Sequence, residues 1–219
     1  GGDAMTISHH PAEDLLLAYA SGAADEAVSL LIATHLTFCG DCRKTVRAAE
    51  AAGGALLADL APARMSDESL EEAFSRLDSD LAPPPAVKLP FSDARVPAPL
   101  AAYLDGDLDS LRWRPILPGL WDRPLMRRGA TRVRLIRGRA GRTIDTHSHR
   151  GMELSVVLTG GFTDTTGNDL RGDAQTADAA LTHKQTVDPG EDCVILALTD
   201  GPLKFARAHV GLFAKLFGF

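Results

Sequence analysis

Three residues near the start of the chain have the types and the spacing of metal ligands. His35, Cys39 and Cys42 follow the pattern H-x3-C-x2-C. Residues four apart on a helix share a face, so His35 and Cys39 can converge. We expect Gly40 to let the chain turn and to bring Cys42 back to the same point. Two thiolates and a neutral imidazole suit tetrahedral zinc, so the pattern predicts a zinc site.

A closed structural zinc site needs a fourth ligand. We expect this ligand to be His10, which precedes Pro11 at the start of the first predicted helix, and His9 is the alternative. A disulfide and a redox-active pair are the other interpretations of Cys39 and Cys42. A redox-active C-x2-C pair usually follows a strand, whereas a helix is expected here.

A second group of candidate ligands lies farther along the chain. Residues 141–160 follow the pattern G-x5-H-x-H-x3-E-x6-G, which contains His147, His149 and Glu153. Histidines at positions i and i+2 of a strand point to the same face, and Glu153 starts the next predicted strand. His183 is placed to complete the set. Three imidazoles and one carboxylate suit Zn, Fe, Mn or Ni.

The first group must be positioned by helices. Apolar periodicity, acidic first turns and helix-stopping Gly and Pro predict four helices, over 11–21, 24–38, 42–60 and 67–81. The composition then changes, because six prolines fall within residues 82–99. That density breaks regular structure and indicates a semi-rigid linker.

The second group must be positioned by strands. Beyond the prolines, short apolar runs alternate with Gly, Asp and Asn, a pattern typical of an all-β barrel or sandwich. We therefore expect an all-α domain at 5–81, a Pro-rich linker at 82–96 and an all-β domain at 97–219. Residues 1–4, which precede Met5, are interpreted as an expression-tag remnant.

Charge and composition narrow the classes of partner. The net charge of −6 divides into −9 for residues 1–81 and +3 for residues 82–219. Phosphate contacts need clustered Lys and Arg, so the acidic half argues against direct nucleic-acid binding and suits a basic protein partner. No apolar run reaches the roughly 18 residues of a membrane span. Three cysteines and no secretion leader indicate a cytoplasmic protein.

The first group of ligands resembles a known family. His35, Cys39 and Cys42, with His10 at the place of the upstream histidine, resemble the zinc-containing anti-sigma domain over residues 5–81. The resemblance implies that this domain binds an extracytoplasmic-function (group IV) sigma factor. It also implies that binding blocks engagement of the sigma factor with core RNA polymerase.

The last predicted helix fits such a role. Leu70, Phe74, Leu77 and Leu81 form one apolar stripe on an otherwise acidic helix. Such a stripe can dock into a groove on a partner. The alternative is that the stripe packs against the other three helices.

The second group resembles the cupin family. Residues 141–160 match the first cupin motif at every position, which implies a cupin β-barrel. The resemblance also implies a metal, zinc or another divalent transition metal, held by His147, His149, Glu153 and His183. The second cupin motif is incomplete, because the usual P-x-G-x-x-H sequence that leads into this last histidine is absent.

A zinc anti-sigma domain joined to a cupin-like domain is the architecture of ChrR-type anti-sigma factors, which the sequence resembles along both domains. The resemblance implies a non-enzymatic regulator of transcription. It would release its sigma factor under oxidative stress, singlet oxygen above all, through the cupin domain. Cys193, within an apolar run, is either a redox residue of that domain or a small buried hydrophobic residue.

Two other interpretations compete with this one. The chain could be a metal-dependent cupin enzyme of the dioxygenase type with a helical oligomerisation module, although no further catalytic acid or nucleophile is evident in the sequence. A thiol switch at Cys39 and Cys42, in which oxidation releases zinc, is a mechanism within the anti-sigma interpretation.

Overall fold

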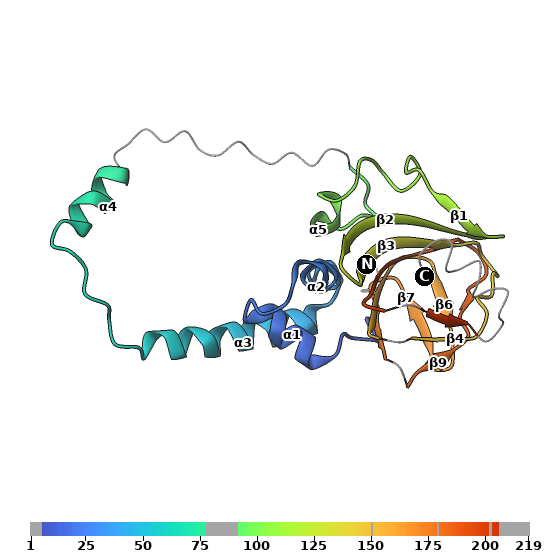
Figure 1. The fold of residues 1–219 in the computed structure, drawn as a ribbon, viewed down its shortest axis with the longest axis horizontal. Coiled ribbons are helices and arrows are strands. Elements are labelled where there is room, and N and C mark those ends of the chain that lie inside the picture. The colour runs from blue at the N-terminus through green and yellow to red at the C-terminus, as the bar shows by residue number, and fades with distance from the viewer. Residues whose placement is uncertain (1–5, 78–91, 150, 179, 202, 206–219) are drawn as a thin grey trace.

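The computed structural model describes residues 6–77, 92–149, 151–178, 180–201 and 203–205, which form a helical part and a β-rich part (Figure 1). The four expected helices are confirmed with shifted ends: α1 (Glu13–Ala20), α2 (Glu26–Phe38), α3 (Gly40–Ala58) and α4 (Ser69–Leu77). None of the helices among these residues is long and apolar enough to cross a membrane.

The junction of α2 and α3 consists of one residue. Asp25 caps the start of α2, because its Oδ1 accepts the backbone N–H of Val28 at 2.8 Å. Cys39 alone separates the two helices, with φ −95° and ψ 111°. Its Sγ accepts the backbone N–H of Cys42 at 3.4 Å and so caps α3. The expectation of a turn at Gly40 is wrong, because Gly40 is the first residue of α3.

The β-rich part begins with the short helix α5 (Ala98–Ala101). The strands that follow are β1 (Arg114–Leu117), β2 (Leu120–Arg128), β3 (Thr131–Gly138), β4 (His147–His149), β5 (Glu153–Thr159), β6 (Gly161–Thr163), β7 (Asn168–Leu170), β8 (Ala174–Ala177), β9 (Thr182–His183), β10 (Thr186–Val187), β11 (Cys193–Thr199) and β12 (Leu203–Phe205). All described strand pairs are antiparallel.

The strands form one large and two small sheets. The six-stranded sheet has the order β1-β2-β3-β11-β5-β8, and the small sheets have the orders β10-β6-β7 and β12-β4-β9. Val157, Cys193 and Ile195 of the large sheet pack in one apolar cluster with Phe162 and Val187 of a small sheet. The large sheet therefore covers an apolar interior on one of its faces.

The other face of the large sheet is covered by α2. This helix contacts β3, β5 and β11, and Leu31 and Ile32 on it are fully buried. They belong to the same apolar cluster as Leu135, Leu154 and Leu196 of the sheet. The helical part and the β-rich part consequently share one hydrophobic core.

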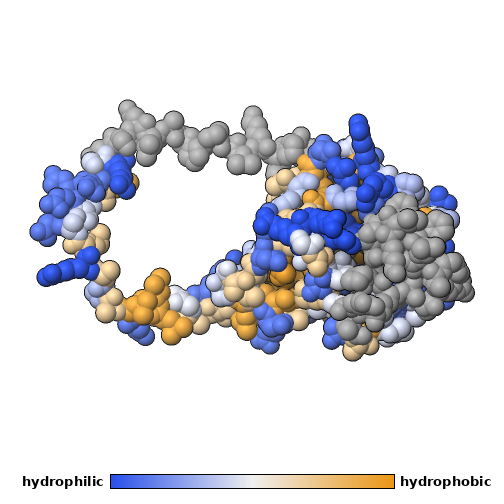
Figure 2. Space-filling view, viewed as in Figure 1, coloured by the Kyte–Doolittle hydropathy of each residue, from blue (hydrophilic) through white to orange (hydrophobic). Residues whose placement is uncertain are grey.

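The end of α3 and all of α4 lie outside this core. Figure 1 shows α4 far from the β-rich part, and none of its residues is buried. Leu70, Phe74 and Leu77 are 66%, 57% and 78% exposed. Leu56 and Leu57 near the end of α3 are exposed too, and Figure 2 shows an apolar surface there. The expected stripe therefore does not pack on the other helices; Leu81, its last member, lies outside the described residues.

We expect Leu31→Ala to destabilise both parts of the molecule together. Truncation of a fully buried leucine costs about 2–5 kcal/mol, and this leucine lies in the shared core. Thermal midpoints measured by far-UV circular dichroism, for the helices, and by fluorescence of Trp113 and Trp121, for the strands, should therefore fall equally. Leu56→Ala, at an exposed site, is the matched control. A fall of the circular dichroism midpoint alone would show that the two parts unfold independently.

Candidate metal centres

Four side chains of the helical part converge on one point. His10 Nδ1 lies 3.4 Å from Cys39 Sγ and 3.3 Å from Cys42 Sγ, and His35 Nε2 lies 3.3 Å from Cys42 Sγ. Two ligand atoms on a tetrahedral zinc, each roughly 2.0–2.3 Å from it, are separated by roughly 3.5 Å. The distances in this group, which we call the helical cluster, therefore fit a tetrahedral ion.

Three segments supply the helical cluster. His35 lies in the last turn of α2, Cys39 at the junction, and Cys42 in the first turn of α3. His10 comes from the extended segment that precedes α1. The first three side chains are buried and His10 is exposed at the rim. An ion held here would tie together three segments that are otherwise joined by a single-residue turn and a loop.

Burial sets the protonation of the helical cluster. It lowers the pKa of His35 to about 4, so the imidazole is neutral at pH 7, which is the ligand form. The His35 Nδ1–H donates to the carbonyl oxygen of Gly172 at 2.8 Å, which leaves the Nε2 lone pair directed at Cys42. Burial also raises the pKa of the Cys42 thiol to about 12. A divalent cation is the natural means of stabilising a thiolate there.

A second group lies in the β-rich part. His147, Glu153 and His183 bring one ligand atom each within 4.8 Å of one another, and all three residues are buried. We call this group the sheet cluster. β4 and β9 pair so that His147 lies opposite His183, and their Nε2 atoms are 3.1 Å apart. His183 therefore lies in the sheet cluster although the second cupin motif is incomplete.

Hydrogen bonds at the far side of each ring orient the sheet cluster. His147 Nδ1–H donates to the carbonyl oxygen of Asp145 at 3.0 Å. His183 Nδ1–H donates to Asp164 Oδ2 at 2.8 Å, and both of these side chains are fully buried. Each ring therefore presents its Nε2 to the other, as in metal sites in which a carboxylate or carbonyl fixes the histidine. The backbone of His149 is part of β4, but its side chain lies outside the described part of the structure.

A third group, His9, Asp169 and Asp173, also satisfies the distance requirement. The carboxylate of Asp173 already accepts three backbone N–H groups, those of Ser8 at 2.7 Å, His9 at 3.0 Å and Leu170 at 2.8 Å. His9 Nδ1 lies 3.3 Å from Asp169 Oδ1, and burial raises the pKa of Asp169 to about 6. This group anchors the N-terminal segment to the β-rich part, and His9 is engaged away from the helical cluster.

Cys193 belongs to neither cluster of ligands. It is 4% exposed on β11 and packs with Phe162 and Val187. Burial raises the pKa of its thiol to about 12. The thiol is therefore protonated at neutral pH and is a poor nucleophile.

Two groups that position the ligands carry no signal in the sequence. Asp164 lies in a turn rich in threonine, and its spacing to His183 follows no motif. Gly172 contributes only a backbone carbonyl, and it must be glycine: its φ is +93°, and a Cβ there would lie 2.5 Å from Ile7 Cδ1 and 2.9 Å from Phe38 Cβ. A Gly-Asp pair predicts a turn, but nothing in it points to His35.

These features define a class of protein: a helical module with a His/Cys cluster that could hold a metal, packed on a cupin-type β-fold that has a His/Glu/His cluster of its own. Residues 104–203 match the ChrR Cupin-like domain. The chain is also 40% identical over 201 residues to the anti-sigma-E factor ChrR of Cereibacter sphaeroides, a match that covers 92% of this chain and 93% of that protein. The chain belongs to the ChrR family of anti-sigma factors, and the expected all-α and cupin fold classes are confirmed.

Two solved structures show how far this likeness extends. The crystal structure of Rhodobacter sphaeroides SigE in complex with the anti-sigma ChrR matches with a TM-score of 0.77 at 39% identity, covering 89% of this chain and 100% of that one. An acetylacetone dioxygenase from Acinetobacter johnsonii matches with a TM-score of only 0.38 at 15% identity, covering 42% of this chain and 66% of that one. The second likeness carries no argument for enzymatic activity, and membership of the anti-sigma family confirms the expectation of a non-enzyme.

We expect the purified full-length chain to hold two metal ions and Cys42→Ala to hold one fewer. The substitution removes one of two thiolates from the four-ligand set, and the remaining three ligands cannot close a tetrahedron. Elemental analysis by mass spectrometry measures the content directly. Cys193→Ala, which removes a buried cysteine outside both clusters, should retain both ions. Equal metal content in the two variants would contradict the assignment of the helical cluster.

We expect Cys193 to resist alkylation in the native protein. With a pKa of about 12, about one thiol in ten thousand is ionised at pH 8, and burial blocks access to it. Iodoacetamide followed by peptide mass spectrometry should find this cysteine modified only after denaturation. Rapid labelling of the folded, metal-loaded chain would show that the thiol is accessible.

Proposed function

We propose that this chain is an anti-sigma factor that binds a group IV sigma factor related to SigE and blocks its engagement with core RNA polymerase. The observation that carries the proposal is the 40% identity to ChrR over 92% of the chain. The crystal structure of SigE with ChrR, which this chain matches over 89% of its length, supports it. Oxidative stress, singlet oxygen above all, would release the sigma factor through the cupin-like part.

The surface proposed to bind the sigma factor is the apolar stripe of α4. Leu70, Phe74 and Leu77 recur at helical spacing and are more than half exposed. A helix of nine residues with no buried side chain is not stable alone in water. A partner groove would supply the missing burial. Glu71 and Glu72 in the first turn add negative charge, which suits a basic partner surface.

Metal in the helical cluster would fix the part of the molecule from which α4 extends. Zinc is our assignment for this cluster, because two thiolates and two imidazoles are a preferred tetrahedral zinc set. Structural zinc contributes on the order of 10 kcal/mol to the folding of small modules. For the sheet cluster we propose zinc or another divalent transition metal, since imidazole and carboxylate together suit several of these ions.

The proposed release has a physical requirement. A stress signal in the cupin-like part can expel the sigma factor only if it favours a conformation with weaker sigma affinity. The shared core between α2 and the large sheet offers a route for such a change. Direct oxidation of the helical thiols is less well supported, because Cys39 and Cys42 are only 2% and 4% exposed.

We expect Phe74→Ala to weaken binding of SigE, used as the test partner, by about tenfold or more. Truncation of an aromatic anchor at an interface typically costs more than 1 kcal/mol, and tenfold corresponds to about 1.4 kcal/mol. Titration calorimetry with the full-length chain measures the affinity. The thermal midpoint should hardly change, because Phe74 is 57% exposed and belongs to neither apolar cluster of the described residues.

Leu170→Ala is the matched control, since Leu170 is a 51% exposed apolar residue on β7 of the cupin-like part. It should leave the affinity unchanged. Equal effects of the two substitutions would contradict the placement of the interface on α4. Failure of the unsubstituted chain to bind SigE would count against the proposed function itself.

A further inference from the structure

The turn between β7 and β8 is one of the places where polar groups of the helical part and the cupin-like part meet; Glu26 of α2, which bonds Tyr103 and Arg128, is another. The carbonyl oxygen of Gly172 accepts from His35 Nδ1–H at 2.8 Å. The backbone N–H of Ala174 donates to the carbonyl oxygen of His9 at 3.1 Å, and Asp173 receives the backbone N–H of the same histidine at 3.0 Å. Two residues of the helical part therefore contact this turn. One is His35, a ligand of the helical cluster, and the other is His9, the chain neighbour of the ligand His10.

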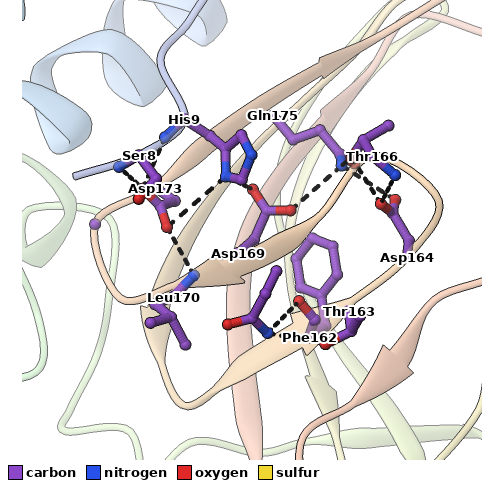
Figure 3. A network of polar contacts seen from close by, with 12 residues as sticks. Ser8, His9, Phe162, Thr163, Asp164, Thr166, Asp169, Leu170, Asp173 and Gln175 are labelled. Carbon is purple, nitrogen blue, oxygen red and sulfur yellow. Dashed lines mark hydrogen bonds and ion pairs between the residues drawn. The ribbon is translucent and has the colours of Figure 1, made fainter. Parts of the chain in front are cut away.

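The side chain of His9 extends the contact into the cupin-like part. Its Nδ1 lies 3.3 Å from Oδ1 of Asp169, a residue that is 1% exposed. Figure 3 shows this pair, with the imidazole directed from the N-terminal segment toward the carboxylate. Because His9 and His10 are adjacent in the chain, the position of this contact restrains the position of a ligand of the helical cluster.

Gln175, the second residue of β8, lies on the other side of this carboxylate. Its Nε2 has three acceptors for two hydrogens: Thr166 Oγ1 at 2.9 Å, Asp164 Oδ2 at 3.1 Å and, as the longest contact, Asp169 Oδ2 at 3.4 Å. The Asp164 oxygen also accepts from His183 Nδ1–H at 2.8 Å, directly behind the sheet cluster. The Gln175 amide therefore contacts two carboxylates (Figure 3). Asp164 orients His183 of the sheet cluster, and Asp169 lies against His9, the chain neighbour of His10 in the helical cluster.

We propose that Gln175 is a positioning residue that couples the two metal centres, so that occupancy of the sheet cluster raises the metal affinity of the helical cluster. The proposal rests on the two metal centres of the proposed function. Hydrogen-bond partners of a metal-bound histidine set the orientation of its ring, and their loss typically costs 10–100-fold in metal affinity. Movement of His183 shifts Asp164 and with it Gln175. Coupling of this kind is reciprocal, because it is a free energy shared by two binding equilibria.

The test measures the affinity of the helical cluster alone. Co²⁺ bound by thiolates has a charge-transfer absorption that Co²⁺ bound by imidazole and carboxylate lacks, so the full-length chain loaded with Co²⁺ reports on this cluster optically. Competition with a chelator of known affinity gives the dissociation constant. Four proteins are compared: the unsubstituted chain, His147→Ala, which disables the sheet cluster, Gln175→Leu, and the double variant.

In the unsubstituted background, His147→Ala should weaken Co²⁺ binding at the helical cluster about fivefold or more, the lower end of typical coupling. In the Gln175→Leu background the same substitution should change the affinity less than twofold. Thr163→Val, which removes a hydroxyl bonded to Asp188 outside this connection, should retain the full effect. Glu153→Gln, nearly isosteric, replaces His147→Ala if that variant does not fold.

Two results would overturn the proposal. One is an unchanged affinity on disabling the sheet cluster in the unsubstituted chain, and the other is an equal change in both backgrounds. Elemental analysis of the same samples separates this failure from that of the proposed function. If two ions are bound without coupling, only the role of Gln175 is contradicted. If one cluster holds no metal, the proposal of two metal centres is contradicted as well.

Discussion

The burial of α2 on the large sheet is the contact on which the rest of the structure depends. α2 carries His35 in its last turn and ends at Cys39, so the sheet fixes the place of two candidate ligands. Leu31 and Ile32 are fully buried in this contact, and a buried side chain of this size contributes roughly 1.5–3 kcal/mol. A metal in the helical cluster would therefore join α3 and the N-terminal segment to a surface that hydrophobic packing has already positioned.

Spacing within a few residues was enough to predict that His35 lies beside Cys39 and Cys42 and that His147 lies beside Glu153, whereas His10 and His183 join these groups from farther along the chain. The H-x3-C-x2-C pattern and the first cupin motif place most of their members by local helix and strand geometry. The turn at the helix junction shows a limit of such reasoning. Gly40 has the freer backbone, yet Cys39 makes the turn because its sulfur can also cap the next helix. Backbone propensity alone does not include the contribution of this capping contact.

The groups that support the ligands could not be predicted in this way. Asp164 and Gln175 act on residues that lie close only after the strands have paired, and single polar residues in turns carry no spacing signal. One feature of the sequence does indicate that α2 is packed on more than one side. Its buried residues are Ala27, Leu30, Leu31, Ile32, Thr34 and His35, which surround more of the helix than one neighbour can cover.

Apolar side chains are buried in α2 and exposed in α4. α2 commits its leucines to the sheet, where they are fully removed from water. α4 instead exposes Leu70, Phe74 and Leu77 on a short helix with an acidic first turn. Surface of this kind is costly for an isolated protein and useful for one that spends its time in a complex. The buried side chains of α2 stabilise the scaffold, and the apolar side chains of α4 are left exposed to solvent.

The bond between Ser8 and Asp173 spans 165 positions of the chain. During synthesis, His10, His35, Cys39 and Cys42 leave the ribosome long before the β7–β8 turn exists. Closing so long a loop is slow, since its entropic cost comes before any contact repays it. The nascent helical segment thus possesses its ligands but lacks the carbonyl that orients His35. The hydrogen bond that orients His35 can therefore form only after the β7–β8 turn has been synthesised.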